Sequence, residues 1–360
     1  MSHDVTSLIK VDHLVKHFSV KTRMGSISAV KAVDNISFHI SEGETVGLVG
    51  ESGSGKSTTG RLMLRLLEPT SGSTRYAGAD VYSLKGTALR DFRKSAQIVF
   101  QDPYGAFDPR MTVGRILGEA LDLKGVKGRV ERNLEVDRLL QVVKLPTYYK
   151  HRFPHEFSGG QRQRIGIARA IAVEPKFIVA DEPVSALDVS TQAEIINLFL
   201  ELQATLNLTM LFISHDLSVV RVLADRTIVL FSGKIMEMAK TTDLFDAPMH
   251  PYTQELLAAI PTPNPDSANR DRKRTIHSDY SDEQTDQPNT GCPYAGRCGQ
   301  TMDICWTTMP DLKHYSTGIG VGAIHSTACH WAENNAATNI DKKGDFSTGH
   351  TAYGDAIGEV

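Results

Sequence analysis

The sequence lacks long apolar segments, a strong net charge and any recognisable leader. No hydrophobic run approaches the roughly 18 residues that a membrane-spanning helix needs, so we expect any span to be supplied by other chains. The first residues show no positively charged stretch followed by an apolar one, and we expect no secretory signal. The net charge of -3 at pH 7 predicts neither a nucleic-acid partner nor a surface for anionic lipid.

Cysteine is also scarce, and its distribution is uneven. The four cysteines all lie in the last fifth of the chain, as Cys292, Cys298, Cys305 and Cys329. An even number permits disulfides, but a chain without a secretory signal is expected in a reducing compartment, where disulfides are rare. Clustered thiols in such a chain indicate metal ligands first. Four unrelated buried thiols are the alternative.

What the chain does contain is typical of a globular protein. Its 360 residues are 41% hydrophobic and 22% charged, and this length suggests two domains. Short alternating runs in residues 8–40 predict strands of a small antiparallel sheet, with residues 19–28 as a polar loop between them. Further on, apolar strands alternate with helical patterns, which predicts a parallel sheet with helices on its faces.

Changes of composition divide the chain into segments. Amphipathic helical patterns follow one another over about 105–165, and the polar, charged composition after residue 260 indicates a linker. We therefore predict a main domain at 1–260 with a helical part at about 105–165, a linker at 261–290, a cysteine-bearing extension at 291–331 and a disordered tail at 332–360.

A glycine-rich loop follows the predicted strand at 45–49. Residues 50–57 match the pattern GxxxxGK[ST] and precede a predicted helix. In such a loop, backbone N–H groups point at phosphate oxygens, and the helix N-terminus adds positive potential. Lys56 would contact the outer phosphates and Ser57 would ligate Mg²⁺. A glycine-rich turn without a ligand is the alternative, which the flanking strand and helix disfavour.

Two adjacent carboxylates, Asp181 and Glu182, follow the apolar strand predicted at 177–180 and precede Pro183. Taken alone, they would cap the N-terminus of a helix. Beside a phosphate loop, Asp181 would hold Mg²⁺ through water, and Glu182 would orient or deprotonate the attacking water.

A further set of motifs indicates a family. The run from Phe157 to Gln161 reads FSGGQ and resembles the signature of ABC proteins, usually written LSGGQ. Gln101 resembles the Q-loop glutamine of this family, residues 185–188 its D-loop and His215 its switch histidine. A Ser-Gly-Gly cluster alone would be a helix cap, but here all the motifs occur in the family's order.

The resemblance implies a fold and a mechanism. The fold is an α/β P-loop ABC nucleotide-binding domain, with a RecA-like parallel sheet core, an antiparallel β-subdomain and an α-helical subdomain, followed by the small cysteine-bearing extension. Two such domains sandwich two ATP molecules, and the phosphate loop of one faces the signature of the other. ATP binding closes the dimer, and hydrolysis reopens it.

The family's site residues can be placed on this sequence motif by motif. ATP would be held by Phe18, stacked on the adenine, and by Gly50, Ser52, Gly53, Ser54, Gly55, Lys56, Ser57 and Thr58. The partner's ATP would contact Ser158, Gly159, Gly160, Gln161 and Asp188. Catalysis would depend on Glu182, His215, Gln101 and Lys56, and Mg²⁺ binding on Ser57, Gln101 and Asp181. A plain core phenylalanine is the alternative for Phe18.

Within the family, the segments at 46–53, 101–113, 154–164, 180–190 and 250–257 resemble the ATPases of oligopeptide and dipeptide permeases, and the resemblance covers about 8–263 and more weakly 291–331. The run at 108–113 resembles the F-type more than the D-type subunit, which implies an F-type subunit that powers peptide import. Its partners would be a related ATPase in a heterodimer, two transmembrane permease subunits and, indirectly, an extracytoplasmic substrate-binding protein. It would lie peripherally on the cytoplasmic face of the inner membrane. Nickel, glutathione and sugars remain open as cargo.

The cysteine motif at the end of these ATPases holds a [4Fe–4S] cluster. Four thiolates suit such a cluster or a tetrahedral Zn²⁺ ion, and the absence of CxxC pairs here favours the cluster. The cluster would fold the extension and leave the ATP site intact. One departure is that residues 264–290 are polar and irregular, where the family usually has a short strand and a proline-rich run.

Two other functions need to be distinguished from transport. A soluble ABC protein of DNA repair or translation usually carries two cassettes or a long coiled-coil insert, and this chain has one cassette and no insert. A non-hydrolysing regulator would have lost the equivalent of Glu182 or His215, and both are present.

Overall fold

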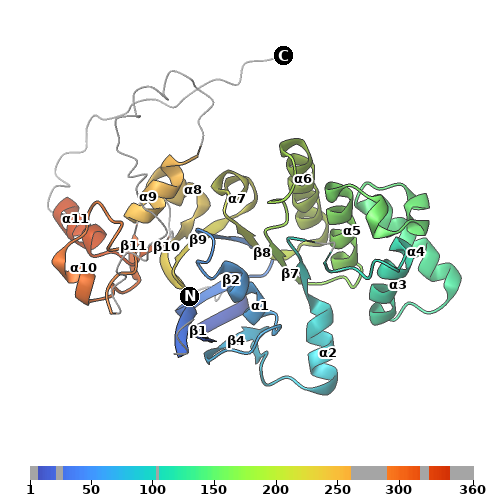
Figure 1. The fold of residues 1–360 in the computed structure, drawn as a ribbon, viewed down its shortest axis with the longest axis horizontal. Coiled ribbons are helices and arrows are strands. Elements are labelled where there is room, and N and C mark those ends of the chain that lie inside the picture. Colours follow the sequence, from blue (N-terminus) through green and yellow to red (C-terminus); the bar gives the residue numbers. More distant parts are fainter. Residues whose placement is uncertain (1–6, 22–26, 103–104, 261–289, 317–323, 341–360) are drawn as a thin grey trace, which may run out of the picture.

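An eight-stranded mixed sheet forms the centre of the molecule (Figure 1). The computed structural model describes residues 7–21, 27–102, 105–260, 290–316 and 324–340. Parallel strands form one part of the sheet, as predicted, and antiparallel strands continue it at one edge. The order is β11 (Lys313–Ser316), β12 (Ile324–Thr327), β10 (Lys234–Lys240), β9 (Arg226–Phe231), β3 (Thr45–Val49), β8 (Thr209–Ser214), β7 (Phe177–Asp181) and β6 (Ala96–Val99).

The two faces of this sheet belong to separate parts of the core. Along β8, Met210 and Phe212 join one apolar cluster while Leu211 and Ile213 join the other, because side chains alternate along a strand. All of β3, β7 and β8 is buried, as expected for parallel strands covered on both faces. The first cluster includes residues of α6 (Val189–Leu206) and α7 (Leu217–Leu223), and the second includes residues of α1 (Lys56–Met63).

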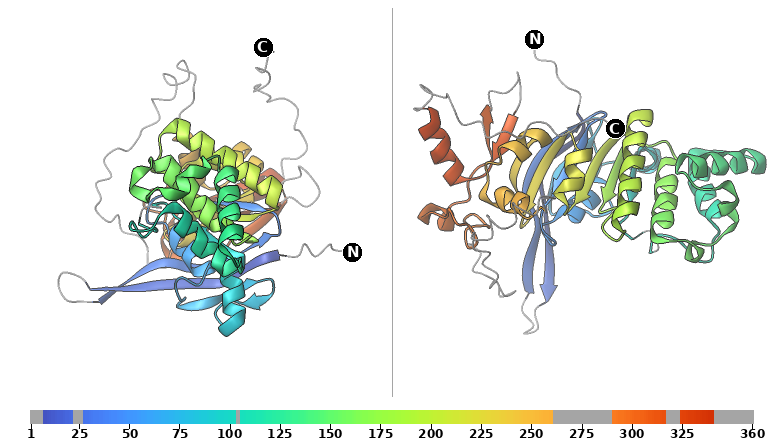
Figure 2. Two further views of the ribbon diagram at one scale, coloured as in Figure 1. Left: turned by 90° about the vertical axis from the view of Figure 1, so that its right-hand side faces the viewer. Right: turned by 90° about the horizontal axis from the view of Figure 1, so that it is seen from above.

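A four-stranded antiparallel sheet packs into the same cluster as α1. Its order is β2 (Ile27–Ser41), β1 (Ser7–Lys21), β4 (Ser71–Tyr76) and β5 (Ala79–Asp80). Strands β1 and β2 form a long ribbon that extends away from the core (Figure 2). The bounds of the polar loop predicted at 19–28 are therefore wrong, since residues 19–21 pair with residues 27–29, while residues 22–26 lie outside the described part of the chain. Backbone hydrogen bonds continue the ladder through these polar positions, so side-chain polarity misplaced the boundary of the loop.

Helices form the end of the molecule opposite the cysteine-bearing extension (Figures 1 and 2). The segment predicted to be helical, about 105–165, contains Val136 and Leu139, which are buried, while Leu134 of the same pattern faces solvent. None of the described helices is long and apolar enough to cross a membrane. The elements here are α2 (Gly86–Ser95), α3 (Val113–Lys124), α4 (Arg129–Val142), η1 (Thr147–His151), η2 (Pro154–Glu156) and α5 (Gly159–Ile171).

The cysteine-bearing extension is built onto the edge of the central sheet. Strand β12 pairs with β10 through Glu237 and Thr327, and β11 pairs with β12. The disordered tail predicted at 332–360 begins instead with a helix, because Ala332 is buried against the extension. Residues 341–360, and 261–289 of the predicted linker, lie outside the described residues. The surrounding helices are α8 (Thr241–Asp246), α9 (Pro251–Ala258), α10 (Asp303–Thr307) and α11 (His330–Ile340).

A buried carboxylate joins the extension to the core. Glu237 of β10 accepts hydrogen bonds from the backbone N–H groups of Met249 (2.7 Å) and His250 (2.9 Å). Its Oε1 lies 2.6 Å from Nε2 of His325 on β12, and both side chains are buried. Because a buried carboxylate without partners is costly, these contacts favour one placement of the extension.

Candidate functional site

The glycine-rich loop joins β3 to α1 at the carboxyl edge of the parallel strands. Gly50 and Gly55 have φ angles of 149° and 103°, in the region that favours glycine. A Cβ at Gly50 would lie 2.1 Å from the carbonyl oxygen of Leu230, and one at Gly55 would lie 2.1 Å from that of Ala32. Glycine is therefore required at both positions for the neighbouring backbone to pack against the loop.

Lys56 is turned into the loop and is 4% exposed. Its Nζ donates to the carbonyl oxygens of Gly50 (2.7 Å) and Glu51 (2.8 Å). Burial lowers the pKa of Lys56, and nearby carboxylates oppose this shift. Lys56 is also the first residue of α1, so the ammonium group and the helix N-terminus favour the same anion. This arrangement suits the phosphates of a nucleotide.

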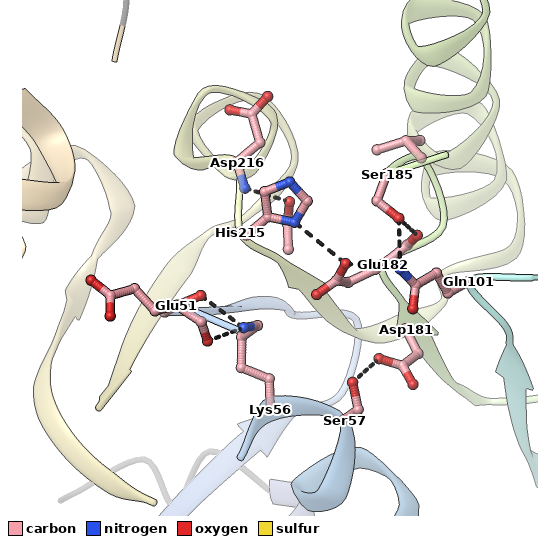
Figure 3. A network of polar contacts seen from close by, with 12 residues as sticks. Glu51, Lys56, Ser57, Gln101, Asp181, Glu182, Ser185, His215 and Asp216 are labelled. Carbon is pink, nitrogen blue, oxygen red and sulfur yellow. Dashed lines mark hydrogen bonds and ion pairs between the residues drawn. The ribbon is translucent and has the colours of Figure 1, made fainter. Parts of the chain in front are cut away.

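A partly buried hydroxyl and a buried carboxylate lie beside the loop (Figure 3). Ser57 Oγ donates to Asp181 Oδ1 at 2.6 Å, and Arg61 lies 3.7 Å from the other carboxylate oxygen. Burial raises the pKa of Asp181, while the hydrogen bond from Ser57 and the charge of Arg61 oppose the rise. Hard oxygen ligands of this kind fit Mg²⁺. Gln101, the third predicted Mg²⁺ ligand, contacts Glu182, and its role toward Mg²⁺ stays a prediction.

Glu182 is the centre of a polar network at the ends of three parallel strands (Figure 3). Its Oε2 lies 3.3 Å from His215 Nδ1 and 3.3 Å from Gln101 Nε2. Gln101 Nε2 also donates to Ser185 Oγ at 3.1 Å, and Ser185 Oγ donates to the Glu182 carbonyl oxygen at 3.1 Å. The structure thus brings the predicted base, the Q-loop glutamine and the switch histidine together. Ser185, the first residue of the D-loop motif, joins them, although no role was predicted for it.

The backbone of Glu182 is held in an uncommon conformation. Its φ is 47°, in the left-handed region that residues other than glycine rarely adopt. Its N–H donates to the carbonyl oxygen of Ile213 on β8 at 3.1 Å. Strained backbone held by a neighbouring strand is common at functional sites, where it orients a side chain.

Phe18 lies on β1 and is 37% exposed. The ammonium group of Lys16 lies 5.1 Å from the centre of its ring, a cation–π distance. Phe18 is therefore a surface residue rather than a core residue, and its ring is accessible to a stacking partner.

The signature and the D-loop meet where α5 and α6 begin. Ser158 caps α5, since its Oγ accepts the Gln161 N–H at 3.3 Å and its own N–H donates to Gln161 Oε1 at 3.1 Å. A Cβ at Gly160 would lie 2.2 Å from Thr191 Cγ2, so a glycine is needed for α5 to approach α6. Asp188 caps α6, and hydrogen bonds from Ser190 and Thr191 lower its pKa to about 2. Ser158 itself is exposed.

The four cysteines line one small pocket in the extension, together with Tyr294 and His330 among others. All four are free, and burial raises the pKa of Cys292 to about 12 and that of Cys329 to about 11. Within the residues that the structure describes, no group of three or more His, Cys, Asp or Glu side chains is placed to hold a metal ion. The predicted cluster or Zn²⁺ site therefore stays a prediction.

Sequence reasoning missed two residues that contact the phosphate loop. The hydroxyl of Tyr252, the second residue of α9, accepts a hydrogen bond from the Glu51 N–H at 2.9 Å. Arg297 forms an ion pair with the Glu51 carboxylate. In the sequence, residues 250–257 indicated only the resemblance to the permease ATPases. No local sequence pattern connects Tyr252 or Arg297 with Glu51, because these residues are far apart in the chain.

Comparisons with known proteins agree with this site. The family model described as ABC transporter matches residues 33–185, and that described as oligopeptide/dipeptide transporter, C-terminal region, matches residues 236–305. A putative peptide import ATP-binding protein of Brucella ovis is 48% identical over 90% of this chain and 98% of its own. The oligopeptide transport ATP-binding protein OppF of Bacillus subtilis is 52% identical over 74% of this chain and 87% of its own.

Solved structures share the cassette fold, and the predicted fold class is confirmed. The dimeric ATP-binding cassette MJ0796 in a post-hydrolysis state bound to ADP and Pi is 30% identical, with a TM-score of 0.59, over 65% of this chain and 98% of its own. The protein cbiO1 of Clostridium perfringens, part of the ABC transporter complex cbiONQ, is 26% identical, with a TM-score of 0.57, over 67% of this chain and 92% of its own. The chain therefore belongs to the ABC transporter family, as an ATPase of the group that carries the oligopeptide/dipeptide transporter C-terminal region.

Proposed function

We propose that this chain is one of two ATPase subunits that power a peptide importer from the cytoplasmic face of the inner membrane. The hydrolytic part rests on one observation, the convergence of Gln101, Glu182 and His215 beside the phosphate loop. The peptide part is supported by relatives named as peptide or oligopeptide import ATP-binding proteins. Relatives named OppF and AppF support an F-type subunit, which pairs with a D-type ATPase.

In this proposal each group of the site has one task. The loop N–H groups and Lys56 bind the ATP phosphates. Ser57 and Asp181 would hold Mg²⁺, which would supply positive charge beside the phosphates. Glu182 accepts a proton from the attacking water, which Gln101 helps to orient. His215 bonds the terminal phosphate. Phe18 stacks on the adenine.

Dimerisation completes each site. Ser158 and Asp188 lie at the exposed starts of α5 and α6, and a helix N-terminus favours phosphate binding. In the sandwich, Ser158, Gly160 and Gln161 contact the ATP held by the partner subunit. The dimeric neighbour bound to ADP and Pi supports this arrangement.

The helical part transmits closure to the membrane subunits. A groove of about 680 Å³ between α3 and α4 is lined by charged side chains of both signs, including Arg115, Arg129 and Glu119, and we place a coupling helix of a permease subunit there. Gln163 of α5 donates to the carbonyl oxygen of Phe100 at 3.2 Å, next to Gln101. Movement of α5 therefore reaches the residue that contacts Glu182.

Reconstitution with the two permease subunits and the D-type ATPase tests the proposed function. We expect the chain to co-purify with them, and hydrolysis to rise when binding protein loaded with oligopeptide is added. Binding protein loaded with nickel, glutathione or sugar is the control for cargo. Stimulation by one of those cargoes alone would contradict peptide import, and failure to assemble with any membrane subunit would contradict transport.

We further propose that the extension holds a [4Fe–4S] cluster rather than Zn²⁺. The four thiols line one pocket, which supports a group that they share. Four thiolates are the usual ligands of such a cluster, and the chain lacks the CxxC pairs that are typical of zinc sites. Cys292, Cys298, Cys305 and Cys329 would hold it, and the cluster would supply cross-links that fold an extension too small for a stable core of its own.

Cys298→Ser tests the proposed cluster. We expect wild-type protein purified without oxygen to be brown and to carry about four irons per chain, and the variant to lose most of both. The variant's extension should become sensitive to protease, while the cassette still binds ATP, although more weakly than in the wild type. Thr307→Ser, at an exposed position of α10, is the control and should keep its iron. A colourless wild type with about one zinc per chain would replace the cluster with a Zn²⁺ site.

A further inference from the structure

The extension touches the phosphate loop directly. Arg297, which lies between the first two cysteines, pairs with Glu51, the second residue of the loop. The two nitrogens Nη1 and Nη2 each lie 2.8 Å from one carboxylate oxygen of Glu51, so the contact is bidentate. In Figure 3 the Glu51 side chain points away from Ser57 and Asp181, which leaves its carboxylate free for this contact.

Arg297 is held in place from several sides. Its Nη2 also donates to Glu255 of α9 at 2.9 Å, and its guanidinium group lies 5.7 Å from the ring centres of Phe231 and Tyr294. Tyr294 donates its hydroxyl proton to Glu255. An arginine fixed by a second carboxylate and two rings loses little further freedom when it binds Glu51.

The negative charge of Glu51 affects the phosphate-binding site because Glu51 is part of the phosphate loop. Its carboxylate is among the groups that raise the pKa of the neighbouring Lys56, so its field reaches the ammonium group that would meet the phosphates. An uncompensated carboxylate at this position would repel a triphosphate. Arg297 supplies the opposite charge. Both side chains are partly exposed, at 28% and 41%, so the effect is expected to be moderate and to weaken with salt.

We propose that Arg297 is a positioning residue of the ATP site, which neutralises Glu51 and holds the phosphate loop from the cysteine-bearing extension. ATP affinity then depends on a folded extension, which revises the expectation that the extension leaves the ATP site unaffected. The proposal rests on ATP binding by this chain and is independent of the imported cargo.

ATP binding by the full-length chain, measured by titration calorimetry with Mg²⁺-ATP at low salt, tests this role. Arg297→Met keeps an unbranched apolar stem and removes the charged guanidinium group. We expect it to weaken ATP binding about fivefold, an effect that shrinks at high salt. Glu51→Gln should bind within about twofold of wild type, and the double variant should resemble Glu51→Gln because the repelling charge is gone. Arg297→Lys should restore part of the loss.

Lys313→Met is the matched control, since Lys313 pairs with Glu333 at 2.9 Å within the extension and makes no contact with the loop. It should bind ATP as wild type does. Wild-type affinity in Arg297→Met would overturn the proposal, as would a double variant as weak as Arg297→Met. An equal loss in Lys313→Met would assign the effect to general destabilisation of the extension. A wild type that fails to bind Mg²⁺-ATP would instead contradict the proposed ATPase function.

Discussion

Glu182→Gln is expected to bind ATP normally while turnover of the assembled transporter falls about 10²–10⁴-fold, the usual contribution of a general base. Glutamine keeps the size of the side chain and can still meet Gln101 and His215, both 3.3 Å from the carboxylate oxygen. It cannot accept the proton of the attacking water. Because ATP then persists between the two subunits, the closed dimer should accumulate, which light scattering with ATP present can detect.

Glu201→Gln is the matched control for this experiment. Glu201 lies exposed on α6 and contacts Lys144, so the same chemical change is made away from the phosphate loop. Turnover should remain at the wild-type level. Near-normal hydrolysis by Glu182→Gln, assayed with all partner subunits, would remove the assignment of Glu182 as the base.

Ser158→Arg is expected to leave ATP binding by the isolated chain nearly unchanged and to lower hydrolysis by the assembled complex about 10²-fold, as loss of one preorganised phosphate contact does. The reason is that Ser158 caps α5 on an exposed surface and would meet the nucleotide of the partner subunit. ATP binding by the isolated chain and hydrolysis by the assembled complex respond differently only if the signature contacts the nucleotide of the partner subunit.

Loss of the helix cap is the side effect that needs a control. Replacing an N-cap serine costs about 1 kcal/mol of stability, so the unfolding midpoint of Ser158→Arg should fall slightly. Thr205→Arg, at the far end of α6, introduces the same bulk and charge away from the signature and should hydrolyse ATP normally. A tenfold loss of ATP affinity in isolated Ser158→Arg, or about 1.4 kcal/mol, would show that the residue acts on its own chain's nucleotide.

The phosphate loop and its flanking elements could be predicted from the sequence because their determinants are local. Only glycine fits where Gly50 and Gly55 meet neighbouring backbone, and the lysine and serine that follow occupy the first turn of α1. The strands before Asp181 and His215 were predictable for a similar reason, since a short apolar run between helices identifies a buried parallel strand.

Errors arose where polarity was used to place a boundary. The ribbon of β1 and β2 continues through a polar segment because its strands satisfy each other's backbone hydrogen bonds. The polar segment after residue 331 begins with α11 because Ala332 packs into the extension. In both places, contacts with residues distant in the sequence determined whether the polar segment forms a strand or a helix.

The sequence by itself therefore determined which groups are expected to take part in ATP hydrolysis, since each motif carries its chemistry in a few adjacent residues. The tertiary structure decided which of these groups meet. Gln101 reaches Glu182 because β6 lies beside β7 in the sheet, so the residues that follow the two strands are neighbours. The contact of Arg297 with Glu51 exists because the extension adds its strands to the sheet edge beyond β10 and packs against the loop. Such pairings depend on how distant segments share a core, which no local pattern records.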